Sequence, residues 1–278
     1  MKGLTLTSVL QAILAAGLGG LGAPVWAQGS DALRAEMPSE VTLLHGWREE
    51  GAHLAGLQID LAPGWKTYWR VPGAGGIPPQ IRFEGSTNLA QAQVGFPTPQ
   101  VFVDYGMRSL GYLSQVVFPV RVTPIDPSAP VQLSFQMEYG VCADICIPAQ
   151  ASGQMTLDPA GKADADPIQQ ALGALPQSHV VHGLSAATCA IRASDSGMLI
   201  EAQMGWPDST EGLPHGVIEA GSDLIWVADP DVARVGEKGV RLTAQMEYFG
   251  EGTATLARER MRFTLISAGR AIDFQGCD

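Results

Sequence analysis

The sequence predicts an all-β protein with two tandem β-sandwich domains joined by a short helical linker. Short apolar or alternating segments recur along the chain and have the pattern of strands. The 33 glycines and 19 prolines lie between these segments and favour turns over long helices. A linker-like stretch at 159–165, followed by a helix start, separates the two groups of strands.

The first 27 residues have the pattern of a secretory signal peptide. Lys2 gives a positive start, residues 4–21 are mostly apolar and small, and small residues precede an expected cleavage site after Ala27. The alternative is an uncleaved membrane anchor, which the many glycines of this segment disfavour. We therefore expect an exported protein.

Charge and motif content exclude several classes of function. The formal net charge is −11 with a sequence pI near 4.8, so nucleic acid and anionic membrane surfaces are poor partners. No Ser-His-Asp order, phosphate-binding loop or dinucleotide fingerprint is present. We expect no cofactor.

The first domain is expected over residues 28–158. Its strands are predicted at 41–44, 52–61, 65–69, 80–83, 111–113, 115–122, 131–137 and 152–157. The two segments 111–113 and 115–122 are interpreted as a pair of strands. Prolines predict a loop at 71–79, and residues 93–100 and 101–106 are also assigned to loops, the second one aromatic.

The linker and the second domain follow. The linker, residues 159–178, contains a short helix with Asp166 as its N-cap and Pro167 at its first position, ending by Pro176. The second domain, residues 179–278, is again all-β. Its strands are predicted at 188–193, 198–204, 216–220, 224–228, 239–248, 262–267 and 270–274.

Two cysteines that flank three residues are the main candidate site. If the chain reverses between Cys142 and Cys146 as a three-residue hairpin, the two residues face each other on antiparallel strands. Their Cα atoms would then lie about 4.5 Å apart, which permits a disulfide. A disulfide that closes so short a loop stabilises the fold only weakly, by about 2 kcal/mol through the loss of loop entropy in the unfolded chain. From the spacing alone, the two cysteines can be a redox-active pair, a structural disulfide or part of a metal site.

The other polar candidates are weaker. Cys189 and Cys277 would close a large loop, and we expect a structural disulfide there, with a second redox pair or two free thiols as alternatives. Asp144 lies between the first two thiols, and its carboxylate would disfavour a thiolate. The five histidines are not spaced like a set of metal ligands, and His179 and His182 come nearest to such a spacing. We therefore expect no metal site.

The cysteine segment resembles a known family. Residues 139–148, YGVCADICIP, resemble the active hairpin of the N-terminal periplasmic domain of DsbD, the thiol:disulfide interchange protein. They are still more similar to the tandem-domain N-terminal part of the related copper-tolerance protein ScsB. Residues 64–68 resemble the family's aromatic strand, 101–106 its cap loop and 111–122 the strand pair after that loop. The cysteine spacing is shorter than in DsbD itself.

The resemblance implies an immunoglobulin-like sandwich in the periplasm. Such a domain relays electrons from a membrane-embedded thiol transporter, DsbD- or CcdA-like, to periplasmic thioredoxin-like proteins. Cys142 and Cys146 would be the catalytic pair, with Cys146 forming the mixed disulfides. The residues expected to shield the disulfide are Phe102, Asp104, Tyr105 and Tyr68. The alternatives are a copper(I)-handling protein that adds a histidine or methionine ligand, and a structural sandwich with staple disulfides.

Overall fold

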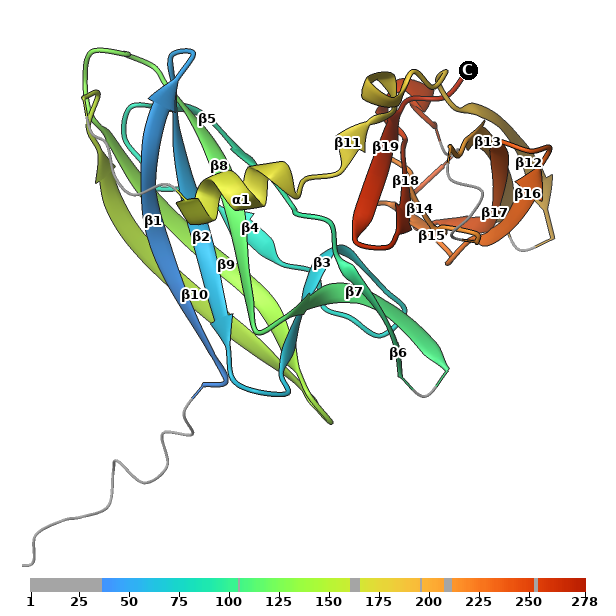
Figure 1. Cartoon of the computed structure of the whole chain (residues 1–278), viewed down its shortest axis with the longest axis horizontal. Coiled ribbons are helices and arrows are strands. Elements are labelled where there is room, and N and C mark those ends of the chain that lie inside the picture. The colour runs from blue at the N-terminus through green and yellow to red at the C-terminus, as the bar shows by residue number, and fades with distance from the viewer. Residues whose placement is uncertain (1–36, 105, 161–165, 196, 208–211, 253–254) are drawn as a thin grey trace, which may run out of the picture. The chain divides into compact units, whose positions relative to one another are not determined.

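β-Strands build most of the described chain (Figure 1). The structure is a computed structural model that describes residues 37–278 except 105, 161–165, 196, 208–211 and 253–254. The predicted signal peptide, residues 1–27, lies outside the described residues. Within the described part there is one α-helix, α1 (Asp166–Gly173), and no helix long and apolar enough to cross a bilayer. The all-β prediction is confirmed.

The first sandwich consists of two sheets with the strand orders β1-β2-β8-β5 and β10-β9-β3-β7-β6, and β4 pairs with β9. Side chains from both sheets form its core, among them Leu57, Trp69, Phe118 and Leu133. Because alternate residues of a strand point to opposite faces, the alternating 131–137 segment buries every second side chain. The strands are β1 (Ser39–Glu49), β2 (Ala52–Leu61), β3 (Lys66–Gly73), β4 (Gln80–Arg82), β5 (Leu89–Val94), β6 (Gln100–Asp104), β7 (Met107–Leu113), β8 (Gln115–Pro124), β9 (Val131–Cys142) and β10 (Cys146–Leu157).

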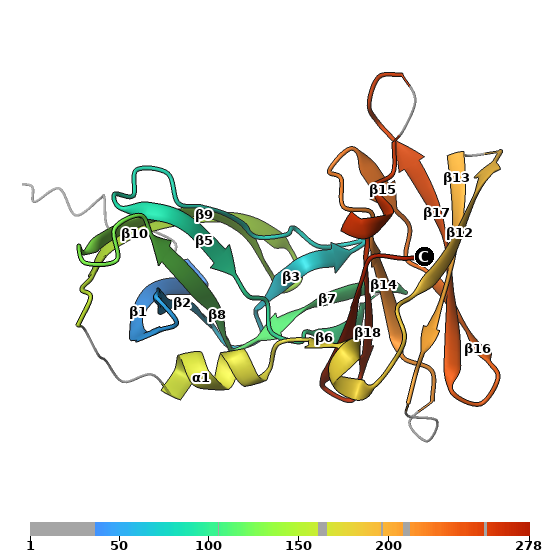
Figure 2. The same ribbon diagram turned by 90° about the horizontal axis from the view of Figure 1, so that it is seen from above.

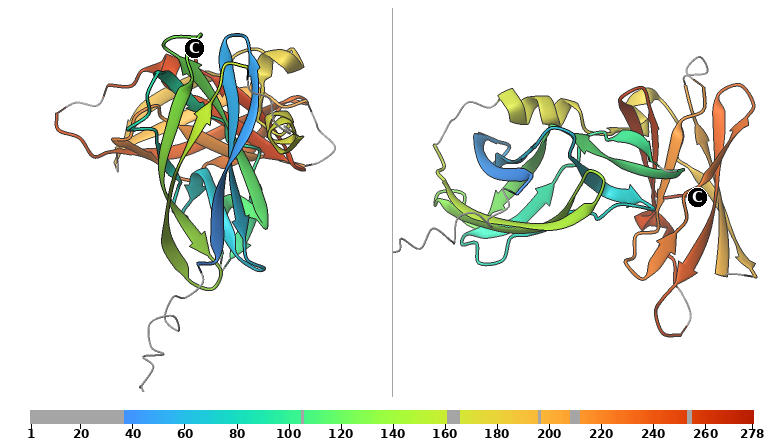
Figure 3. Two further views of the ribbon diagram at one scale, coloured as in Figure 1. Left: turned by 90° about the vertical axis from the view of Figure 1, so that its left-hand side faces the viewer. Right: turned by 90° about the horizontal axis from the view of Figure 1, so that it is seen from below.

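Helix α1 packs on the outside of the first of these sheets (Figure 3). Its Ile168 is fully buried and packs with Val117 of β8. Gly56 of β2 makes room for this side chain, since a Cβ there would lie 3.1 Å from Ile168. The helix starts one residue earlier than predicted, because Asp166 is its first residue rather than its N-cap, and it ends before Pro176.

The second sandwich also has two sheets, β11-β19-β18-β14 and β12-β13-β17-β15, with β16 also paired to β17 (Figure 2). Ile200, Leu242, Phe263 and Phe274 are fully buried between them. All seven predicted strands are present, but two others were not predicted. β11 is only two residues long and was assigned to the linker, and β16 has mostly exposed side chains that show no alternation. The strands are β11 (Gln177–Ser178), β12 (Thr188–Ser194), β13 (Gly197–Gly205), β14 (His215–Glu219), β15 (Ile225–Val227), β16 (Asp231–Val235), β17 (Gly239–Tyr248), β18 (Arg262–Ser267) and β19 (Arg270–Gln275).

The predicted strand pair at 111–122 is wrong as a pair. β7 pairs with β3 and β6 in one sheet, whereas β8 pairs with β2 and β5 in the other. Ser114 is the single residue between them, and its φ of 62° turns the chain from one sheet to the other. One residue is too short for a hairpin, which needs at least two.

All three segments assigned to loops contain strand residues. In 93–100 these are the end of β5, which was not predicted as a strand, and the first residue of β6. β3 continues through Pro72 to Gly73, and this is possible because its pairing with β7 is interrupted between Tyr68 and Gly73, where Pro72 lacks a donor. The aromatic segment at 101–106 includes β6, an edge strand that forms a hairpin with β7. We call β6 and β7, with the turn between them, the cap hairpin.

Candidate functional site

The two cysteines close the end of the long β9–β10 hairpin. The register runs without interruption from Val131 opposite Leu157 to Cys142 opposite Cys146. The amide of Ala143 donates to the carbonyl of Ile145 at 3.0 Å, which tightens the three-residue turn. Cys142 and Cys146 form a disulfide with their Cα atoms 4.1 Å apart. The three-residue hairpin therefore has the geometry that its spacing predicts.

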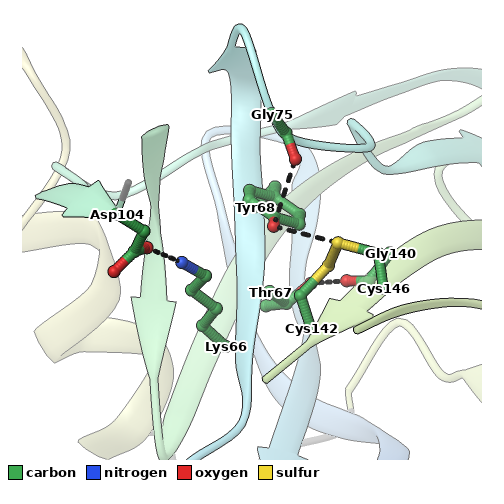
Figure 4. The surroundings of a disulfide bond; sticks show 8 residues. All are labelled: Lys66, Thr67, Tyr68, Gly75, Asp104, Gly140, Cys142 and Cys146. Atoms are coloured by element: carbon green, nitrogen blue, oxygen red, sulfur yellow. Dashed lines mark hydrogen bonds and ion pairs between the residues drawn. A yellow bond between two sulfur atoms is a disulfide. The ribbon is translucent and has the colours of Figure 1, made fainter. Parts of the chain in front are cut away.

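Strand β3 lies beside this hairpin. Lys66 and Thr67 pair with Cys142 and Val141 of β9. The Thr67 hydroxyl donates to the carbonyl of Gly140 at 2.9 Å, a buried bond that fixes the two strands together (Figure 4). The site is thus built on paired strands rather than on a free loop.

The two cysteines differ in exposure. Cys142 is only 1% exposed, between β3 and β10. Cys146, at the start of β10, is an exposed residue. The bond therefore has one accessible and one protected end, an arrangement that allows attack from outside on one sulfur.

Tyr68 of β3 faces the disulfide (Figure 4). Its Oη lies 3.6 Å from Cys146 Sγ and 3.5 Å from the carbonyl oxygen of Gly75. Because a disulfide sulfur carries no proton, only the phenol can donate in this contact, and its single proton is also within reach of the Gly75 carbonyl oxygen. Burial, and secondly the charge of Asp104, raise the pKa of Tyr68, so the hydroxyl stays protonated and able to donate.

The cap hairpin reaches the same face. Asp104, at the end of β6, forms an ion pair with the Lys66 ammonium (Figure 4). The Lys66 Nζ also lies 5.2 Å from the centre of the Phe102 ring, within the range of a cation–π contact. Sequence analysis did not single out Lys66. Its position two residues before Tyr68 on one strand was the available signal, since it places both side chains on one face.

These side chains line one pocket of about 770 Å³. Of the predicted site residues, both cysteines, Tyr68, Phe102 and Asp104 line it, while Tyr105 lies outside the described residues. Other lining residues that sequence analysis did not assign to the site are Lys66, Met107, Ser109 and Leu113. Asp144, between the cysteines, also lines the pocket and is exposed.

The second cysteine pair lies elsewhere. Cys189 of β12 and Cys277, after β19, form a disulfide with a sequence separation of 88. Cys277 is buried, and the Arg258 guanidinium lies 3.9 Å from Cys189 Sγ. Neither cysteine lines the pocket described above. Among the described residues, no three His, Cys, Asp or Glu side chains are close enough together to hold a metal ion, and this includes His179 and His182.

Comparison with known proteins gives a matching family and a similar solved structure. Residues 37–157 match the family described as "Thiol:disulfide interchange protein DsbD, N-terminal". The crystal structure of the N-terminal periplasmic domain of ScsB from Proteus mirabilis is similar, with a TM-score of 0.64 at 22% identity. This similarity covers 88% of the present chain and 96% of that one, so both sandwiches share its fold. No curated protein matches the chain.

Proposed function

We propose that this chain is a thiol–disulfide exchange module whose working bond is Cys142–Cys146, because residues 37–157 match the DsbD N-terminal domain family. In this proposal it takes reducing equivalents from a membrane-embedded thiol transporter and passes them to thioredoxin-like proteins. The observation that carries the proposal is the asymmetry of the bond. Cys142 is 1% exposed, whereas Cys146 is exposed and both line a pocket.

The oxidised form would accept electrons in two exchange steps. A transporter thiolate attacks Cys146 Sγ and forms a mixed disulfide, while the electron pair of the broken bond leaves with Cys142 as its thiolate. A second transporter thiolate then attacks the transporter's own sulfur and releases Cys146 as a thiolate. The transporter keeps the new disulfide, and this chain has gained two electrons.

The reduced form would donate by the same chemistry. The Cys146 thiolate attacks the disulfide of a thioredoxin-like protein and releases one thiolate of that partner. The Cys142 thiolate then attacks Cys146 Sγ, which re-forms the Cys142–Cys146 bond and releases the second partner thiolate. The partner leaves as a dithiol after it takes up protons from water.

An apolar border around the pocket supports transient docking of such partners. Val103 is 68% exposed and Ile145 is 66% exposed, on the cap hairpin and the cysteine turn respectively. Met107 and Leu113 are exposed as well. Exposed apolar side chains that surround a reactive group are typical of a surface that another protein covers.

We propose the periplasm as the location. The support is the signal-peptide pattern of residues 1–27 and the family of the first sandwich. The ScsB fragment with the similar fold is itself described as periplasmic. In such a compartment paired thiols can persist as disulfides.

Copper(I) handling is the second candidate, and one observation favours it. Met107 lines the same pocket as Cys142 and Cys146, so one soft thioether and two potential thiolate ligands share this pocket. Stoichiometric copper(I) binding by the reduced protein that is lost in both C146A and M107L would favour this candidate over exchange.

The exchange proposal is tested by trapping the mixed disulfide. The partner is a thioredoxin-like protein that keeps only its exposed active-site cysteine, activated as a thionitrobenzoate disulfide. We expect the reduced C142A variant to form a covalent adduct through Cys146 and to release thionitrobenzoate. The matched C146A variant should react at least about ten-fold more slowly, because Cys142 is buried.

Two results would contradict the proposal. One is that neither variant forms an adduct while both remain folded. The other is that C146A reacts as fast as C142A, which would mean that exposure does not select the attacking sulfur. Mass mapping of the adduct identifies the cysteine used in each case.

A further inference from the structure

Arg70 is a largely buried cation on the strand that carries Tyr68. The two are alternate residues of β3, and the fully buried Trp69 lies between them. The Arg70 side chain is only 13% exposed, and its guanidinium carbon lies 3.8 Å from the centre of the Trp69 ring. A buried guanidinium needs acceptors, because an uncompensated charge away from water is strongly destabilising.

The acceptors that the structure shows for Arg70 belong to the second sandwich. Its Nε donates to Oε1 of Glu219 on β14 at 3.1 Å, and its Nη2 donates to Oε2 of Glu219 at 3.0 Å. The same Nη2 donates to Thr264 Oγ1 on β18 at 3.2 Å and lies 3.7 Å from Asp273 Oδ1 on β19. These strands are neighbours in the sheet β11-β19-β18-β14, so one side chain of β3 is bound by three strands of the other sandwich.

Apolar side chains of the same three strands pack with Trp69. Val217 of β14, Ile266 of β18 and Ala271 of β19 are buried in the apolar cluster that includes Trp69. Residues 37–278, which contain both sandwiches, form one compact unit. The attachment of β3 to the second sandwich is therefore both polar and apolar.

The part of β3 that follows Tyr68 depends on this attachment. The register of β3 with β9 comprises Lys66 and Thr67, and its register with β7 is interrupted between Tyr68 and Gly73. Arg70 lies in the middle of that interruption. Its bonds to the second sandwich thus hold a stretch of strand where the pairing with β7 is absent.

The loop after this stretch returns to Tyr68. The carbonyl oxygen of Gly75 lies 3.5 Å from Tyr68 Oη, and the same Oη lies 3.6 Å from Cys146 Sγ (Figure 4). A Cβ on Gly76 would lie 2.6 Å from the Tyr68 ring, so this loop and the ring are in close contact. The position of the hydroxyl between Gly75 and Cys146 therefore depends on where residues 69–73 lie.

We propose that Arg70 is a positioning residue through which the second sandwich holds the Tyr68 hydroxyl against Cys146. In the reduced protein this hydroxyl donates to the Cys146 thiolate and stabilises it. When the attachment is lost, residues 69–75 shift, and the single proton of the hydroxyl goes to the Gly75 carbonyl or to water instead. This inference rests on the proposed exchange function, in which it gives the second sandwich a part.

Two variants separate positioning from simple electrostatics by the sign of their effect. R70M removes a positive charge, so electrostatics alone raises the pKa of the Cys146 thiol. E219A removes a negative charge, so electrostatics alone lowers that pKa. If Arg70 positions Tyr68, both variants raise the pKa, because both weaken the attachment of β3 to the second sandwich.

We expect R70M and E219A each to raise the pKa of the Cys146 thiol by about 0.5 units, half of the shift expected when the Tyr68 hydroxyl is removed altogether. The pH dependence of iodoacetamide alkylation of the reduced full-length protein, mapped to Cys146 by mass, measures the shift.

R192M is the matched control. It removes a positive charge from an ion pair with Glu201, and both residues belong to the second sandwich. The pKa of the Cys146 thiol should be the same in R192M as in wild type.

The double variant Y68F/R70M should have the pKa of Y68F alone, because Arg70 acts through a hydroxyl that Y68F lacks. Three results would each overturn the proposal: an unchanged pKa in R70M, a lowered pKa in E219A, and additive shifts in the double variant. If R70M does not fold, E219A and Y68F/E219A decide by the same criteria.

The proposed function can fail separately from this inference. Alkylation needs no partner protein, so raised pKa values in R70M and E219A would support positioning by Arg70 even if no thioredoxin-like protein exchanges with Cys146. Normal trapping of the mixed disulfide with an unchanged pKa in R70M would support the function and remove Arg70 from it.

Discussion

At the scale of single residues, the Tyr68 hydroxyl is the polar group placed to act on Cys146. It lies 3.6 Å from the sulfur, and burial keeps its pKa above the usual value of a phenol. The hydroxyl therefore remains a neutral donor over the pH range in which thiols ionise. Once the disulfide is reduced, a donor at this position favours the Cys146 thiolate over the thiol.

We predict that Y68F raises the pKa of the Cys146 thiol by about one unit, because a hydrogen bond to an ionised acceptor is lost. The pH dependence of iodoacetamide alkylation of the reduced protein, mapped to Cys146 by mass, measures it. Y139F is the matched control, since the Tyr139 hydroxyl bonds to Ser39 and does not line the pocket. An alkylation profile of Y68F that coincides with that of wild type would remove Tyr68 from this role.

At the scale of elements, the pairing of β3 with β7 positions the cap hairpin relative to the cysteines. Gly111 of β7 lies against this pairing, and a Cβ there would be 2.1 Å from the carbonyl oxygen of Thr67. That oxygen belongs to the backbone of β3, so it cannot move away without separating the strands. Thr67 is also the residue whose hydroxyl holds β3 to β9.

We predict that G111A lowers the free energy of unfolding by about 2 kcal/mol, the usual cost of overpacking a well-fitted site. Urea unfolding followed by circular dichroism measures the change. G173A is the control, because a Cβ on Gly173 at the end of α1 meets no atom within 4 Å. Equal urea midpoints for G111A and G173A would mean that β3 and β7 can separate at this point without loss of stability.

The elements also show what the sequence could and could not predict. Local spacing and strand alternation predict that Cys142 and Cys146 lie opposite each other, and in the structure they do. β6 was assigned to a loop because it is an edge strand, stabilised by its ladder with β7 rather than by a buried face. The Lys66–Asp104 contact joins residues 38 apart in sequence, so it depends on the strand order, which no local pattern specifies.

At the scale of the whole molecule, the two disulfides have different surroundings. The cysteines of Cys142–Cys146 are 4 residues apart in sequence, and both line the pocket. Those of Cys189–Cys277 are 88 residues apart, neither lines the pocket, and Cys277 is buried. From loop entropy, the first disulfide contributes about 2 kcal/mol and the second about 4.6 kcal/mol. We therefore propose exchange for the first bond and a structural role for the second.

The most direct test of this assignment is the reduction potential of each disulfide in the folded wild-type protein, from equilibration with defined thiol buffers and mass mapping of alkylated cysteines. We predict a potential for Cys142–Cys146 between about −180 and −280 mV, the range of thioredoxin-like exchange proteins. Cys189–Cys277 should stay oxidised throughout this range. A Cys142–Cys146 potential below about −300 mV, where structural disulfides lie, would contradict the exchange function and leave a stapled β-sandwich.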